Sequence, residues 1–263
     1  MTTEQKEILS KVPAVTLVFW IIKILATTLG ETGGDAMTMS FLGETTGDAH
    51  PYGYLIGTAI FAVIFIAAVA VQIRAKRFHP FLYWLTIIAT TTVGTTLADY
   101  VTRSLGIGYA GGSALLFTLL LASLFVWYRT LGSVSVATVS EPKAEMFYWM
   151  TIMFSQTLGT ALGDWTADGV GLDLGYSGAA IVFGTMLLLI AAAYFWTSIS
   201  RTALFWAAFI ITRPLGAVVG DFLDKPYKKG GLELSRYTAS AALLVLIVAL
   251  ILIFKQKPAE EAH

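Results

Sequence analysis

The stretch WIIKILATTLGETGGD, from Trp20 to Asp35, decides the fold because three further copies of it follow along the chain. The copies are WLTIIATTTVGTTLAD (Trp84–Asp99), WMTIMFSQTLGTALGD (Trp149–Asp164) and WAAFIITRPLGAVVGD (Trp206–Asp221). Each copy begins with Trp, has Gly ten residues later, places a small residue four positions after that Gly, and ends in Asp. Four ungapped matches at intervals of about 57–65 residues indicate an internal structural repeat.

The composition is that of an integral membrane protein. Of the 263 residues, 56% are hydrophobic and only 13% are charged, and the mean hydropathy is +0.73. A soluble domain has about 25% charged residues. The net charge of zero argues against a nucleic-acid partner, and the lack of cysteine excludes a disulfide framework and a thiolate metal site. The sequence has no nucleotide-binding glycine motif and no hydrolase motif, so we do not expect an enzyme.

Eight apolar segments are long enough to cross a bilayer as helices. They lie at about 14–38, 54–73, 81–102, 111–128, 146–167, 177–199, 203–222 and 237–254. We predict an all-α integral membrane fold of eight transmembrane helices, built as four parallel two-helix repeats in a single domain, 1–263. The repeats span about 14–73, 81–128, 146–199 and 203–254. The even-numbered segments are almost featureless, so we expect them to face lipid, with the four odd-numbered segments gathered inside.

The positions of Lys and Arg in the short loops predict the orientation. Ten of these residues fall on one side of the predicted membrane domain and five, among them Arg103 and Lys225, on the other. The richer side should be cytoplasmic, and it carries both termini. Since each repeat is a hairpin, all four enter the membrane in the same direction, related by an axis along the membrane normal.

Each copy of the repeat shows two neighbouring stripes when it is set on a helix. The Gly and the small residue lie four positions apart, which lets another helix approach closely. One step round the helix is a polar stripe, also with a spacing of four. In chain order this stripe reads Thr27, Glu31, Asp35; Thr91, Thr95, Asp99; Gln156, Thr160, Asp164; and Arg213, Ala217, Asp221, with Lys23 one turn before the first. We expect the four polar stripes to face one another across a common wet space.

Ionisable groups in a bilayer segment cost several kcal/mol unless they have a partner or face water. Two cations, Lys23 and Arg213, stand against five stripe carboxylates and leave three negative charges in surplus. Bound cations would keep such a surplus ionised, and otherwise some carboxylates would hold protons. The predicted ion-binding residues are Glu31, Asp35, Asp99, Asp164 and Asp221, with Thr27, Thr91, Thr95, Gln156 and Thr160 as neutral oxygen ligands. Of these, we expect Glu31, Asp35 and Asp164 to ligate a metal.

A structural role is open for several of these residues. Each stripe Asp could end its helix at the water boundary by accepting hydrogen bonds from loop amides. Glu31 has no acidic counterpart in the other copies, and it either serves function or pairs with Arg213 or Lys23. Those two cations either tether carboxylates and gate the path or form a buried salt bridge. Pro214 predicts a kink or break in its helix.

The run VPAVTLVFWIIKILATTLGETGGD, with its three echoes, resembles a bacterial family of uncharacterised, polytopic membrane-anchored proteins. The resemblance implies a location in the plasma (inner) membrane and no known activity. The segment Glu31-Thr-Gly-Gly-Asp35 is also similar to the ExGD[KR][ST] motif of cation–proton exchangers, in which the motif carboxylates bind calcium or manganese. It has one residue more than that motif, and Ala36 stands where the motif has a basic residue.

The leading functional hypothesis is a transporter or exporter of a cation, with divalent manganese, magnesium or calcium favoured because every predicted ligand is an oxygen. Its partners would be the lipid bilayer and the small cation or proton, with no cofactor other than the transported ion. One alternative is a permease for a small polar solute or anion that Arg213 and Lys23 hold. The other is a non-transporting membrane scaffold in which the polar stripes only join the hairpins.

Overall fold

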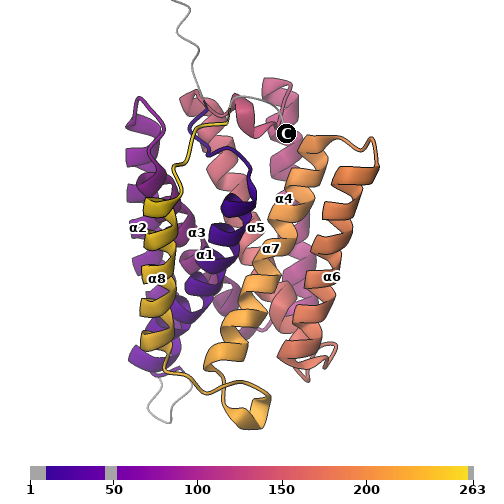
Figure 1. Ribbon diagram of the computed structural model, residues 1–263. Helices are drawn as coiled ribbons and strands as arrows, with labels where there is room; N and C mark the ends of the chain where they lie inside the picture. Colours follow the sequence, from indigo (N-terminus) through magenta and orange to yellow (C-terminus); the bar gives the residue numbers. More distant parts are fainter. Residues whose placement is uncertain (1–9, 45–51, 260–263) are drawn as a thin grey trace, which may run out of the picture.

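The computed structural model describes residues 10–44 and 52–259, and it places eight long helices and no strand in them (Figure 1). The helices are α1 Leu17–Asp35, α2 Gly53–Arg74, α3 Pro80–Asp99, α4 Gly108–Leu131, α5 Pro142–Ala167, α6 Gly175–Trp196, α7 Arg201–Asp224 and α8 Arg236–Ile253. Two π-helical turns, Ala36–Phe41 and Tyr100–Ser104, extend α1 and α3. The prediction of eight helices is confirmed.

Seven of the eight helices are long and apolar enough to cross a membrane, and the exception is α5. It carries Glu145 and Lys143 in its first turns and a polar stripe further on, which lower its hydropathy. The expected break at Pro214 is wrong, because α7 continues through this residue as one helix.

The four odd-numbered helices form a closed inner ring. Within it α1 packs against α3, α3 against α5, α5 against α7, and α7 back against α1. All four run in the same direction because an outer helix returns the chain after each of them (Figure 1). Both ends of the described chain lie at one end of the bundle, here called the termini end. The inner helices run from it to the far end, where each stripe Asp lies.

Each outer helix packs mainly against the inner helix of the following repeat. The pairs are α2 with α3, α4 with α5, α6 with α7, and α8 with α1. The sequence repeat, in contrast, joins α1 to α2 and α3 to α4 through the chain. Consecutive repeats therefore interlock, and the last repeat covers the first, so that a single hairpin would lack its packing partner.

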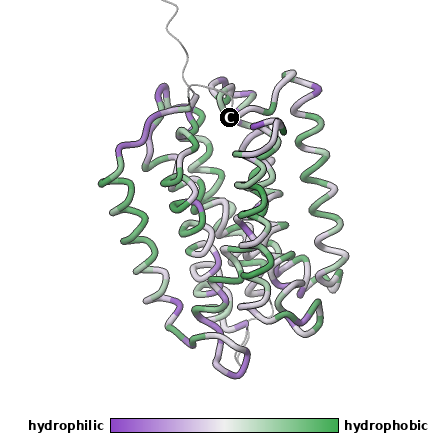
Figure 2. The backbone as a smooth tube through the Cα atoms, turned by 45° about the vertical axis from the view of Figure 1, so that its right-hand side comes forward, coloured by the Kyte–Doolittle hydropathy of each residue, from purple (hydrophilic) through white to green (hydrophobic). Residues whose placement is uncertain are grey.

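Burial separates the two sets of helices. In the most apolar stretch of α1, α3 and α7, 61–72% of the residues are buried, against 11–33% in α2, α4, α6 and α8. The outer helices are mainly hydrophobic along their length (Figure 2), and many of their large hydrophobic side chains are exposed. Leu188 on α6 and Val245 on α8, for example, are 72% and 69% exposed. An apolar outer surface of this extent fits a hydrocarbon environment.

Glycine lets the inner helices approach one another closely. Gly30 lies against Thr91, Gly94 against Gln156, Gly159 against Arg213, and Gly216 against Thr27. A Cβ atom on any of these four glycines would come within 2.9 Å of the facing side chain. The same contact therefore recurs at all four seams of the ring, including the seam that closes α7 onto α1. The repeat in sequence is thus a repeat of packing, as the glycine stripe predicted.

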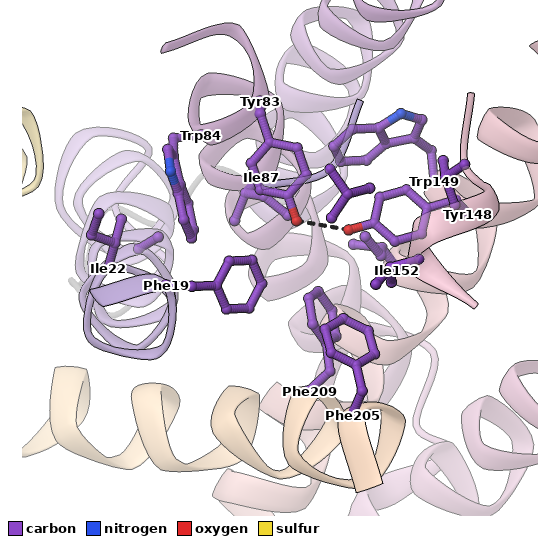
Figure 3. Packing of buried hydrophobic residues seen from close by; sticks show 14 of the residues in the cluster. Phe19, Ile22, Tyr83, Trp84, Ile87, Tyr148, Trp149, Ile152, Phe205 and Phe209 are labelled. Atoms are coloured by element: carbon purple, nitrogen blue, oxygen red, sulfur yellow. Dashed lines mark hydrogen bonds between the residues drawn. The ribbon is translucent and has the colours of Figure 1, made fainter. Parts of the chain in front are cut away.

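Aromatic side chains fill the interior of the ring at the termini end. Phe19, Tyr83, Trp84, Tyr148 and Trp149 are buried together there, with Phe205 and Phe209 beside them (Figure 3). The hydroxyl groups of Tyr83 and Tyr148 are 2.7 Å apart and share a hydrogen bond. Trp84, Trp149 and Trp206, three of the four repeat tryptophans, are buried, so they pack within the bundle. This aromatic cluster closes the termini end of the interior.

The chain ends cover the aromatic cluster. The amide of Ala14 donates to the carbonyl of Lys257, and the amide of Ala259 donates to that of Val12, both over 2.8 Å. Gln256 accepts a hydrogen bond from the indole of Trp84, also over 2.8 Å. Segments from the two ends of the chain thus pair across the termini end.

Candidate functional site

The four polar stripes face one another inside the ring, and their side chains form successive layers along its axis. Thr27, Thr91, Gln156 and Arg213 form one layer, Glu31, Thr95 and Thr160 the next, and the four stripe Asp residues a third near the far end. All of these side chains are buried. The predicted site residues are therefore brought together by the fold, although they come from four separate segments.

Arg213 joins the four inner helices at the middle layer. Its Nη2 atom donates to Glu31 Oε2 over 2.9 Å and to Thr95 Oγ1 over 2.7 Å, and it also contacts Thr160 Oγ1. The side chain of Arg213 is fully buried and that of Glu31 is 3% exposed. Of the roles left open for Glu31, pairing with Arg213 is the one seen in the structure. This ion pair joins α1 and α7, and the two threonines add α3 and α5.

Two cations from beyond the stripes reach back to the Asp layer. Arg103 lies 2.9 Å from Asp99 and 2.9 Å from Asp164, so it bridges α3 and α5. Lys225 lies 2.8 Å from Asp221 and also contacts Asp35, so it bridges α7 and α1. Asp224 and Arg236 extend the second group, with 2.8 Å between them.

These contacts correct the expected charge balance. Lys225, which is buried, and Arg103, whose side chain is 30% exposed, both contact the Asp layer instead of extending into the outer loops, so four basic residues face the five stripe carboxylates. The surplus falls from three negative charges to one. Burial lowers the pKa of Lys225, but the carboxylates of Asp221, Asp35 and Asp224 outweigh it and hold that pKa well above the usual value. Lys225 therefore stays cationic among them.

Three carboxylates converge closely enough to share one ion. Glu31, Asp35 and Asp221 each place a ligand atom within 4.8 Å of the other two, and all three are buried. One oxygen of Asp35, Oδ1, has no hydrogen-bond partner among the described residues. Asp221 holds the place in this group that the sequence suggested for Asp164, which binds Arg103 instead.

Lys23 lies one turn deeper, at the border of the aromatic cluster. Its Nζ atom is 3.4 Å from Thr212 Oγ1 and 4.1 Å from the centre of the Phe209 ring. No ion pair of Lys23 is found within the described part of the chain. It therefore places a basic group on the termini side of Arg213.

Sequence reasoning missed Arg103 and Lys225 as members of the site, although the sequence holds a signal for both. Each follows its stripe Asp by four residues, so each extends the polar stripe by one further turn. The corresponding residues in the first and third repeats are Met39 and Asp168. A basic residue therefore occupies this position in alternate repeats.

Comparisons with known proteins support the repeat and supply no activity. No curated protein and no solved structure matches the chain. A family model described as Repeat of Unknown Function (DUF347) matches four times, at residues 18–78, 82–133, 147–200 and 204–257. Since these matches cover most of the 263 residues, the protein belongs to this repeat family.

Proposed function

We propose that this protein is an integral membrane carrier for a divalent cation, which binds between Glu31, Asp35 and Asp221. The convergence of these three buried carboxylates inside the ring carries the proposal. Magnesium, calcium and manganese prefer oxygen ligands of this kind. The neighbouring threonine hydroxyls of the middle layer offer further neutral oxygens at the same depth.

Lys225 explains how the carboxylates stay neutralised when no ion is bound. Its ammonium bridges Asp35 and Asp221, two of the three proposed ligands. The side chain is 10% exposed and belongs to the connection after α7, at the far end. An arriving cation would displace this ammonium toward the far end, where water solvates it. Lys225 is thus a tethered competitor for the transported ion.

The aromatic cluster and the distribution of Lys and Arg indicate how the carrier is oriented in the membrane. The cluster closes the termini end, so the site is nearer to the far end. The excess of Lys and Arg at the termini end favours a cytoplasmic location for both termini, in the inner membrane of a bacterium. The far end then faces outward. The similarity of Glu31–Asp35 to the exchanger motif supports exchange of the cation for protons.

The test is ion flux through the purified full-length protein in proteoliposomes, with manganese, magnesium and calcium offered separately. We expect flux of at least one ion, reduced roughly tenfold or more by Glu31→Gln or Asp35→Asn, because each removes one anionic ligand. Asp173→Asn is the matched control, since Asp173 is an exposed carboxylate in the loop after α5. Flux that survives both site substitutions unchanged would remove the proposal.

A non-transporting membrane scaffold is the second candidate. The specific observation in its favour is that each of the five stripe carboxylates has a cationic partner at 2.9 Å or less. In that case the charged layers serve to hold the interlocked repeats in register. Proteoliposomes would then show no flux for any ion, and divalent cations would leave the melting temperature of the purified protein unchanged.

A further inference from the structure

We propose that the layer formed by Thr91, Gln156 and Arg213 binds a chloride-sized monovalent anion, which the protein carries together with the cation. This inference deepens the proposed function, and it is tested in two ways. The transport arm, which measures ion flux, depends on the proposed function. The binding arm, which measures melting temperature, does not, because it uses the protein without a bound cation and a simple salt.

The three residues occupy equivalent positions in three successive repeats, so they lie at the same level of the ring. Thr91 lies against Gly30, Gln156 against Gly94, and Arg213 against a glycine of α5. None of the three side chains is exposed to solvent. Their helices are consecutive neighbours, since α3 packs against α5 and α5 against α7.

Polar atoms of this layer lack protein partners. Thr91 Oγ1, both amide atoms of Gln156, and the Nε and Nη1 atoms of Arg213 have no hydrogen-bond partner among the described residues. Arg213 alone presents three N–H groups on these two nitrogens, and the Gln156 amide adds two. Burial of donors without acceptors is costly, so the layer is built to meet something that accepts hydrogen bonds. The surplus of donors over acceptors favours an anion.

The charge around the layer also favours an anion. Arg213 has one carboxylate partner among the described residues, Glu31, which is also a proposed ligand of the cation. Lys23 adds a second buried basic group one turn away, next to Thr212 and Phe209. When Glu31 turns to the cation, Arg213 loses its counter-ion, and a buried unpaired guanidinium is strongly unfavourable. A small anion at Nε and Nη1 restores the balance, whereas a water molecule satisfies the hydrogen bonds without the charge.

The binding arm compares the melting temperature of the purified full-length protein in sodium chloride and in sodium gluconate, whose anion is too large for the layer. We expect chloride to raise the melting temperature by about 3–5 °C at ten times its Kd. Gln156→Glu places a fixed carboxylate in the same layer as Arg213 and should remove the chloride effect. Gln156→Leu keeps the volume, loses the amide donors and should weaken the effect. Equal melting of the wild-type protein in the two salts would show that only water occupies the layer and would overturn the inference.

The transport arm measures manganese flux in proteoliposomes prepared with chloride or with gluconate on both sides. We expect roughly tenfold slower flux in gluconate, and manganese-driven uptake of labelled chloride. Gln156→Glu should carry manganese at similar rates in both salts. Manganese flux that ignores the anion refutes anion coupling and leaves cation transport standing. Absence of manganese flux, together with a chloride shift in melting, refutes cation transport and leaves the anion site standing.

Discussion

Removal of the Glu31 charge should destabilise the protein more than the loss of both members of the ion pair. Glu31 Oε2 lies 2.9 Å from Arg213 Nη2, and both side chains are buried between four helices. Glu31→Gln leaves the guanidinium in place with no carboxylate. Loss of one partner of a buried pair costs about 3–5 kcal/mol, whereas apolar replacement of both partners is often close to neutral.

The size of the effect can be refined from the contacts. Glutamine still offers one carbonyl oxygen, and Arg213 keeps the hydroxyl groups of Thr95 and Thr160. The expected cost is therefore near the lower limit, about 3 kcal/mol, which lowers the melting temperature by roughly 6–12 °C for a chain of this size. The double variant Glu31→Met with Arg213→Met should melt within a few degrees of the wild type.

The assay is thermal unfolding of the purified protein in detergent, followed by circular dichroism. It compares the wild type, Glu31→Gln, the two single variants Glu31→Met and Arg213→Met, and the double variant that combines these two. Asp173→Asn, which removes an exposed carboxylate, should change stability by no more than about 0.5 kcal/mol. A Glu31→Gln variant as stable as Asp173→Asn would refute the reasoning, because it would show that the buried guanidinium of Arg213 does not depend on the Glu31 carboxylate. Additive effects of the two single variants in the double variant would refute it as well.

The remaining predictions concern packing, the tethered lysine and orientation. Gly159→Ala should cost about 1–3 kcal/mol because its Cβ would overlap α7, while Gly184→Ala, with open space around it, should be neutral or stabilise by about 0.4–1 kcal/mol; thermal melting compares them. Lys225→Met should lower the melting temperature in EDTA, and manganese should restore it, since the metal replaces the ammonium between the two carboxylates. Equal melting temperatures of this variant in EDTA and in manganese would contradict the role of Lys225 as a tethered competitor. Because the chain has no cysteine, Val170→Cys should react with an impermeant maleimide on intact cells and Thr197→Cys only after lysis; the reverse pattern would invert the orientation.

The helices and their grouping could be predicted from the sequence because one stretch repeats with two stripes at helical spacing. The glycine stripe requires close helix contacts, and it makes the same contact at every seam of the ring. The polar stripe must avoid lipid, which places it inside. The interlock of each outer helix with the next repeat could not be predicted in this way. The outer helices are nearly uniform in hydrophobicity, so their pattern selects no particular neighbour.

The charge balance of the site could not be predicted from a polar stripe that ends at Asp in each of the four repeats. Helical spacing alone continues it by one turn, to Arg103 after Asp99 and to Lys225 after Asp221. Hydropathy assigned both residues to loops, since a Lys or Arg at the end of an apolar segment normally reaches water. Here the nearby carboxylates offer a stronger partner, and the π-helical turn after α3 keeps Arg103 within reach of its own helix.

The basic residue four positions after the stripe Asp occurs only in alternate repeats, and this spacing divides the charges around the ring. Four carboxylates at one level would repel one another, and a basic residue in every repeat would neutralise them completely. A basic residue in the second and fourth repeats alone gives each cation two carboxylates, its own and that of the next inner helix. The Asp layer is thus divided into two bridged pairs, one joining α3 to α5 and the other joining α7 to α1. The pair that includes α1 also lies beside Glu31, so the three convergent carboxylates form at this seam because it combines a bridged Asp pair with the unique glutamate.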